Sequence, residues 1–145
     1  MNNDIKFPIM DLTESTFQEE KVFFSDMEWD SELILNKKQI ERLPDRIYID
    51  SEGKILKVKI GKIEKINSIM SFLSSPKYKV DLLLINTGEL FQMEDLKREI
   101  LLKRNQMFHI YHNKLMTVDE FENKIVNARN YLEVIDIASF EDYKD

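Results

Sequence analysis

The sequence contains no cysteine, and it has three glycines and three prolines among 145 residues. The absence of cysteine excludes disulfides, thiolate metal sites and a cysteine nucleophile, and it fits a reducing compartment. So few glycines and prolines argue against an all-β sandwich, which needs many tight turns, and against a glycine-rich loop that would hold a phosphate group. P-loop and dinucleotide-binding folds therefore have little support.

Long apolar runs are missing as well. The longest aliphatic run, residues 82–85, is far shorter than the roughly 20 residues that cross a bilayer. Residues 1–10 lack the basic start and the apolar stretch of a secretory signal peptide. We therefore expect a cytoplasmic chain that makes no contact with membranes.

The chain does contain enough apolar sequence to fold. Hydrophobic residues make up 43% and charged residues 33%, which excludes a disordered chain of low hydrophobicity. A length of 145 residues fits a single domain, 1–145. Within it we distinguish an acidic N-terminal third at 1–45, a repeat-like core at 46–137 and a short acidic tail at 138–145.

The order of apolar patterns predicts the fold class. Segments rich in β-branched and aromatic residues are expected to be strands, at 46–50, 55–60, 78–86, 107–112 and 133–137. Apolar residues spaced three and four apart predict helices at 63–73, 94–104 and 118–132, the last one capped by Thr117 and Glu120. This order favours an α+β fold, with a largely antiparallel sheet of β-hairpins and helices packed on one side.

The second half of the chain aligns with itself at an offset of 25 residues. Residues 85–101 match residues 110–126, and each copy is expected to form a strand, a turn at Gly88 or Asn113, a return strand and a helix. A shorter upstream match places Gly53 at the same turn position. The alternative is chance similarity between hairpins, because turn chemistry alone restricts the residue types.

Negative charge is concentrated near the N-terminus. The net charge is −6, and residues 1–45 contain 11 acidic and five basic residues, which accounts for the whole excess. An acidic surface repels nucleic-acid phosphates and attracts a basic protein, an attraction that salt weakens. We therefore expect a basic protein as the partner and do not expect nucleic acid.

Residues 23–33 contain the main candidate site. If the segment is a strand, its alternate acidic residues lie on one face and Trp29 on the other. These acidic residues are Asp26, Glu28, Asp30 and Glu32. A straight row of carboxylates suits a basic protein surface, with Trp29 as an aromatic anchor, better than a metal ion, which needs converging oxygen ligands. The alternative is a solvated outer face that keeps an edge strand soluble.

A short motif marks a second candidate site. Asp45 after a proline, followed after six intervening residues by Glu52-Gly53-Lys54, resembles the PD-(D/E)-x-K nuclease superfamily. The resemblance implies a metal-dependent phosphodiesterase, in which the two acids hold Mg²⁺ and the lysine steadies the phosphate or the attacking water. Asp50 would be the spare ligand. The residues themselves favour a hairpin turn at 51–54, which would point Glu52 and Lys54 into solvent.

The histidines and the lysines are further candidates. His109 and His112 would point to opposite faces of the strand expected at 107–112, so a shared metal site is not expected. A basic stretch has three open roles: binding phosphate, protecting a strand edge, or meeting the acidic third within the molecule or between subunits. Its members are Lys54, Lys57, Lys59, Lys62 and Lys65.

One main hypothesis follows. The protein is expected to be a non-enzymatic protein-binding domain, without cofactor or metal, whose acidic surface engages a basic partner such as a toxin or a nuclease. Its size, acidity and lack of cysteine resemble those of bacterial immunity proteins and antitoxin-type inhibitors. The alternatives are the metal-dependent nuclease and a structural subunit of a homo-oligomer, which would show a large apolar surface.

Overall fold

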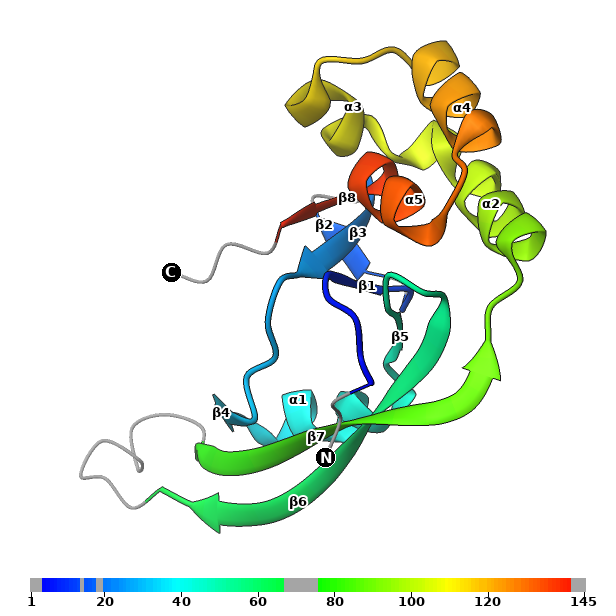
Figure 1. Ribbon diagram of the computed structural model, residues 1–145. Helices are drawn as coiled ribbons and strands as arrows, with labels where there is room; N and C mark the ends of the chain where they lie inside the picture. Colours follow the sequence, from blue (N-terminus) through cyan, green and yellow to red (C-terminus); the bar gives the residue numbers. More distant parts are fainter. Residues whose placement is uncertain (1–3, 14, 18–19, 67–75, 142–145) are drawn as a thin grey trace.

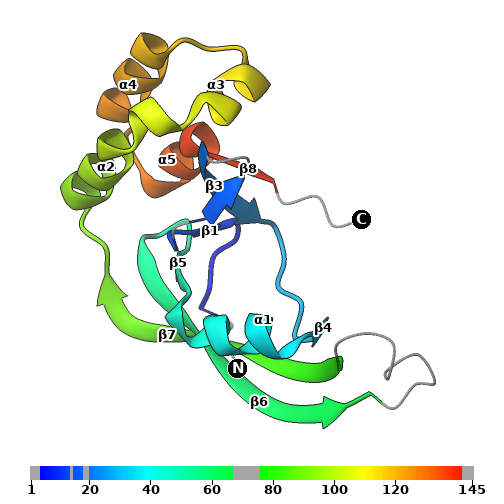
Figure 2. The same cartoon turned by 180° about the vertical axis from the view of Figure 1, so that it is seen from behind.

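The computed structural model describes residues 4–13, 15–17, 20–66 and 76–141 of the chain (Figure 1). A curled sheet forms a half-barrel, and a layer of helices lies at one end of it (Figures 1 and 2). Almost every strand pairing is antiparallel; the pairing of β3 with β8 is parallel. The expected fold class, α+β with a largely antiparallel sheet and helices packed on one side, is confirmed.

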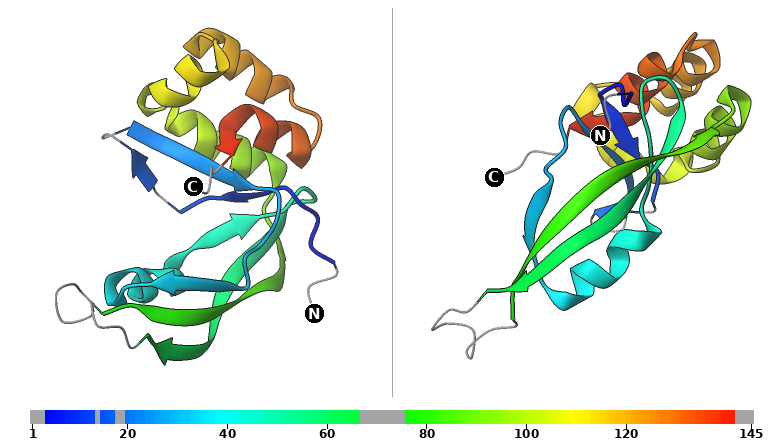
Figure 3. Two further views of the ribbon diagram at one scale, coloured as in Figure 1. Left: turned by 90° about the vertical axis from the view of Figure 1, so that its left-hand side faces the viewer. Right: turned by 60° about the horizontal axis from the view of Figure 1, so that its bottom comes forward.

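The strands follow the order β2-β3-β1-β5-β6-β7-β4, and β8 lies beside β3. The long strands β6 and β7 pair as a curved antiparallel hairpin, which forms the side of the half-barrel away from the helical layer (Figure 3). The bounds are β1 Ile9–Asp11, β2 Ser15–Phe17, β3 Glu20–Asp26, β4 Glu32–Leu35, β5 Ile47–Ile49, β6 Lys54–Lys65, β7 Tyr78–Leu90 and β8 Ser139–Glu141.

The helices fall into two groups. One short helix and a 3₁₀ turn lie beside β4, at the opposite end of the molecule from the main helical layer (Figures 1 and 2). These are α1 Lys37–Arg42 and η1 Leu43–Asp45. The layer consists of α2 Met93–Leu102, η3 Arg104–Gln106, α3 Phe108–Lys114, α4 Val118–Asn127 and α5 Tyr131–Ala138.

Strands β1 and β5 separate two apolar cores. Because side chains alternate across a strand, Ile9 and Tyr48 face the inside of the half-barrel, whereas Met10 and Ile49 face the helices. Ile9, Met10 and Ile49 are fully buried. The core inside the half-barrel is completed by Ile5, Leu43, Leu56, Val58, Val80, Leu82 and Leu84. This core forms the floor of the site described below.

Local capping signals fix the starts of three helices. The side-chain oxygens of Asn36, Thr117 and Asn130 each accept a hydrogen bond from the backbone N–H three residues later, at the starts of α1, α4 and α5. At α1 the bond is reciprocal, because Gln39 accepts from the backbone of Asn36. The expected cap by the Thr117 side chain is confirmed. The helix expected at 94–104 forms as α2, which ends two residues earlier, at Leu102.

Three expected elements are wrong. Residues 108–112 lie in α3 rather than in a strand, and residues 133–137 lie in α5. The helix expected at 118–132 is divided into α4 and α5. The physical reason is tertiary: these helices bury apolar side chains against the sheet, and this burial outweighs the strand preference of β-branched and aromatic residues.

The helix expected at 63–73 is also wrong where it can be compared. Strand β6 continues to Lys65, and residues 67–75 lie outside the described residues. Gly88 has the expected left-handed φ of 84°, but it lies within β7, so no separate return strand forms there. Since the second copy of the repeat begins in α3, the repeat is unconfirmed. Gly53, with φ 82°, does form the expected turn between β5 and β6.

Among the described residues, no helix combines the length and the apolar character needed to cross a bilayer.

Candidate functional site

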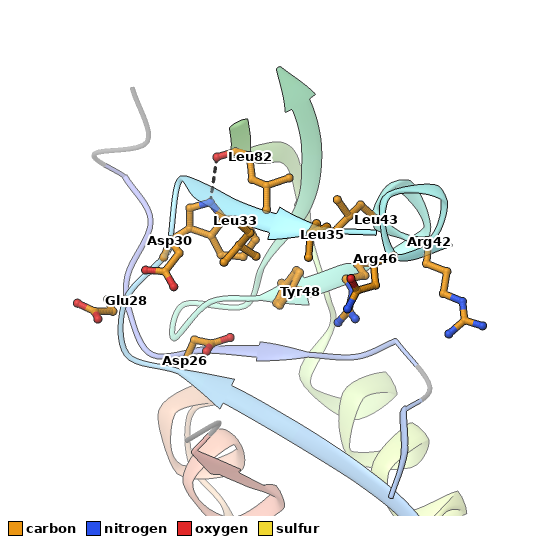
Figure 4. A pocket seen from close by; sticks show the side chains of 12 residues that line it. Asp26, Glu28, Asp30, Leu33, Leu35, Arg42, Leu43, Arg46, Tyr48 and Leu82 are labelled. Carbon is orange, nitrogen blue, oxygen red and sulfur yellow. Dashed lines mark hydrogen bonds between the residues drawn. The ribbon is translucent and has the colours of Figure 1, made fainter. Parts of the chain in front are cut away.

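A pocket of about 340 Å³ opens at the side of the half-barrel (Figure 4). One wall is the end of β3 and the connection to β4, residues 26–30, and the opposite wall is α1 with η1 and the residue after it. The floor is apolar and comes from the core inside the half-barrel. It contains Leu33, Leu35, Leu43, Tyr48 and Leu82.

The acidic wall contains four of the five predicted partner-binding residues. Asp26 is the last residue of β3, and Glu28, Trp29 and Asp30 lie in the connection that follows it. The expected single strand over 23–33 is therefore wrong, because β3 ends at Asp26 and β4 starts at Glu32. The chain nevertheless brings the three carboxylates to one end of the same pocket (Figure 4).

The fifth predicted residue, Glu32, does not line this pocket. Its carboxylate lies 3.5 Å from the Nζ of Lys79 on β7, in a separate hollow with Lys62 and Asp81. A lysine of the same molecule therefore balances its charge. The continuous acidic row expected from the sequence is broken at this point.

The three carboxylates of the pocket differ in accessibility. Glu28 is exposed and makes no ion pair with another described residue. Asp26 and Asp30 are half-buried, and each interacts with other groups of the protein. Glu28 is therefore the carboxylate most available to a partner, while Asp26 and Asp30 add negative potential around it.

Trp29 connects the acidic wall to the floor. Its indole N–H donates a hydrogen bond of 3.2 Å to the carbonyl of Leu82, and its ring meets the ring of Tyr48 edge-on at 5.6 Å (Figure 4). It is half-buried and packs against the core inside the half-barrel. One part of the Trp29 side chain therefore belongs to the core, and another part lines the pocket.

Two arginines form the opposite wall of the pocket. The guanidinium of Arg46 lies 2.6 Å from a carboxylate oxygen of Asp11, which is 3% exposed. Burial, followed by the negative charge of Asp11, raises the pKa of Tyr48, so the Tyr48 hydroxyl stays protonated at neutral pH. Arg42, at the end of α1, is exposed and pairs with no acidic side chain among the described residues.

Sequence reasoning missed this basic wall. Arg42 and Arg46 lie 12 or more residues beyond the acidic segment, and no spacing between the two segments indicates contact. Both segments line one pocket because β1 pairs with β3 on one side and with β5 on the other, which places these strands in one sheet with a single strand between them. Such pairings are long-range and leave no local signal in the sequence.

The nuclease-like motif forms a structural turn. Asp50 is fully buried, and its carboxylate accepts hydrogen bonds from the backbone N–H groups of Lys6, Glu52 and Lys54 at 2.9–3.1 Å. The Nζ of Lys54 lies 3.4 Å from Asp50 and 3.9 Å from Glu52. Asp45 is exposed at the end of η1. The described part of the chain contains no group of three acidic or histidine side chains placed to hold a metal ion.

The prediction for the two histidines assumed a strand at 107–112, but residues 108–112 lie in a helix. His109 and His112 both lie in α3, where residues three apart share a face, so the expected separation on opposite strand faces is wrong. His112 is exposed, and the side chain of His109 is outside the description.

Part of the basic stretch lies on the solvent-exposed face of strand β6. Lys57 and Lys59 are exposed on β6 and alternate with the buried Leu56 and Val58, as expected from the pattern. Lys62 lies 2.6 Å from Glu64. The acidic third does not cover Lys57 and Lys59 within the described residues.

Comparisons with known protein families, curated proteins and solved structures gave no match to this chain. The interpretation of the pocket therefore rests on its geometry.

Proposed function

We propose that the protein is a non-enzymatic protein-binding domain whose pocket receives a basic side chain of a partner protein. One observation carries the proposal: Asp26, Glu28, Trp29 and Asp30 line a single pocket with an apolar floor. Glu32 is no longer part of the proposed contact, because Lys79 balances its charge.

The chemistry of the pocket matches a lysine or arginine side chain. Such a side chain has an apolar stem and a cationic end, and it loses little when the stem is buried against apolar groups. Trp29, Leu33 and Leu35 are half-buried in the pocket lining and offer the apolar contact, and the Trp29 ring adds cation–π attraction. Glu28 offers the opposite charge at the rim.

The acidic pocket also favours fast association. Complementary charge steers two proteins together and raises the association rate more than it raises the affinity, and salt weakens the effect. Inhibitors of the immunity or antitoxin type use acidic side chains to cover the lysines and arginines of a toxin or nuclease. We extend the proposal to this class, with the cytoplasm as the site of action.

A charge reversal at Glu28 tests the proposal. Glu28→Lys replaces the most accessible carboxylate, and Glu41→Lys makes the same charge change on the exposed surface of α1, outside the pocket. The parent protein is used to capture partners at low salt, and association rates with the identified partner are then measured. We expect Glu28→Lys to lower the rate about tenfold and to flatten its salt dependence, because steering is electrostatic.

Glu41→Lys controls for the change in net charge. A rate that falls equally in both variants would show that the whole molecular charge, and no particular pocket, attracts the partner. A rate unchanged by Glu28→Lys would overturn the proposal. Asp26 is left unchanged in this design because it is half-buried beside Tyr48, so its reversal would disturb the fold.

A further inference from the structure

The pocket carries charge of both signs at separate ends. Figure 4 shows the carboxylates of Asp26, Glu28 and Asp30 at one end and the side chains of Arg42 and Arg46 at the other, with the guanidinium of Arg42 directed outward from the pocket. Apolar and aromatic side chains lie between them. A basic side chain in the pocket would satisfy the acidic end and leave the basic end facing the ligand.

Arg42 is the cation that a ligand can reach. Arg46 already binds the buried carboxylate of Asp11 at 2.6 Å, so its charge is largely balanced within the protein. Arg42 is exposed, and none of the described acidic side chains pairs with it. It is the last residue of α1, and its guanidinium carries five N–H donors.

We propose that the pocket binds a group that carries a cation and a carboxylate joined by an apolar stem. A C-terminal arginine or lysine residue has this chemistry, and so does the free amino acid. In the bound state, the side-chain cation lies at Glu28 and the stem lies over Trp29, Leu33 and Leu35, which are half-buried in the pocket lining. The exposed side chain of Arg42 turns toward the pocket and binds the carboxylate, for which the guanidinium suits bidentate contact. This inference rests on the proposed function, since it uses the same acidic end.

The size of the pocket agrees with such a ligand. About 340 Å³ is at the lower limit of small-molecule sites, which enclose roughly 300–1,000 Å³. The space is suited to one residue with its terminal carboxylate, and a long peptide would extend past the rim. An apolar floor with a few charged groups at its ends is the usual composition of a specific small-ligand site.

Calorimetric titration with three probes tests the inference. The probes are an acetylated tetrapeptide that ends in arginine with a free carboxylate, the same peptide with a C-terminal amide, and free L-arginine. We expect the free carboxylate to bind about fivefold tighter than the amide, the size of a partly exposed ion pair. Arg42→Gln removes this difference, and Lys38→Gln, which changes the same charge on α1 outside the pocket, preserves it.

Each result has a defined meaning. Equal affinity for the acid and the amide, or no binding of either peptide, overturns the inference; the proposed function is then still decided by the capture experiment with Glu28→Lys. A preference for the acid that persists in Arg42→Gln also overturns it. If the inference holds, free L-arginine that binds as tightly as the peptide identifies a small-molecule ligand, and peptide binding alone identifies a chain terminus.

Discussion

The ring of Tyr131 lies so close to Gly53 that a Cβ atom at position 53 would come within 2.3 Å of the Tyr131 Cζ. The Tyr131 hydroxyl donates a 2.6 Å hydrogen bond to the carbonyl of Phe91, and the N–H of Phe91 donates to the carbonyl of Gly53 at 2.9 Å. These three residues join α5, the β5–β6 turn and the segment after β7. The helical layer is thereby fixed to the half-barrel at this point.

We predict that Gly53→Ala destabilises the protein more than Gly88→Ala. Both glycines have a left-handed φ, 82° and 84°, so both substitutions cost about 1–2 kcal/mol in backbone strain. A Cβ at Gly88 has nothing within 4 Å, whereas a Cβ at Gly53 collides with Tyr131. Urea unfolding should show a loss of about 3 kcal/mol for Gly53→Ala. Equal losses would mean that the Tyr131 contact adds no constraint.

A second prediction concerns the buried carboxylate of Asp50. Asp50→Ala removes the acceptor of three backbone N–H groups and leaves Lys54 without its nearest charge partner. We expect the free energy of unfolding to fall by about 3 kcal/mol, because hydrogen bonds to a charged group contribute about 1.5–3 kcal/mol and buried donors are left unpaired. Chemical denaturation measures this loss.

Glu52→Ala is the matched control for Asp50→Ala. Glu52 lies in the same turn, but its side chain is 56% exposed and 3.9 Å from the Lys54 amine. Such a surface pair contributes little, so we expect a change within about 0.5 kcal/mol. If Glu52→Ala were as damaging as Asp50→Ala, the turn would depend on both carboxylates. Magnesium-dependent cleavage of nucleic acid by the parent but not by Glu52→Ala would revive the nuclease alternative.

Elements with local signals could be predicted from the sequence. Gly53 marks a hairpin turn because glycine adopts positive φ without strain, and Thr117 marks a helix start because its hydroxyl caps a backbone N–H. The start of α5 had a similar signal, since Asn130 accepts from the backbone of Glu133. The strand preference of Val134 and Ile135 nevertheless favoured a strand at this position. Intrinsic secondary-structure propensity does not include the tertiary contacts that bury these two side chains in a helix.

The path of the chain through the site could not be predicted in the same way. Apolar and acidic residues alternate equally well in a strand and in an extended connection, so residues 26–32 fit both. The pairing of β4 with β7, residues more than 40 positions apart, decides that β4 starts at Glu32. The pocket is therefore a product of tertiary pairing, although its acidic wall comes from the short segment 26–30.

The last prediction concerns the stability of the helical layer at high pH. Burial raises the pKa of Tyr111 to about 12 from an ordinary value of 10.0. The Tyr111 hydroxyl donates to the carbonyl of Arg104, and its ring packs against Phe121 at 5.0 Å. Since the folded-state pKa is raised, the hydroxyl's stabilising contribution is complete below pH 10 and is lost as the pH rises toward 12.

Tyr111→Phe keeps the ring and removes the hydroxyl, so it isolates this contribution. At neutral pH we expect the variant to be less stable than the parent by about 1 kcal/mol, the value of one hydrogen bond. Between pH 10 and pH 12 the difference in stability should shrink. In this range Tyr111 of the unfolded parent ionises while the folded parent keeps its hydroxyl protonated, which favours unfolding of the parent and has no counterpart in the variant. Unfolding free energies of both proteins across this range provide the measurement. Two curves that stay parallel would show that the Tyr111 hydroxyl ionises at the same pH in the folded and unfolded chain.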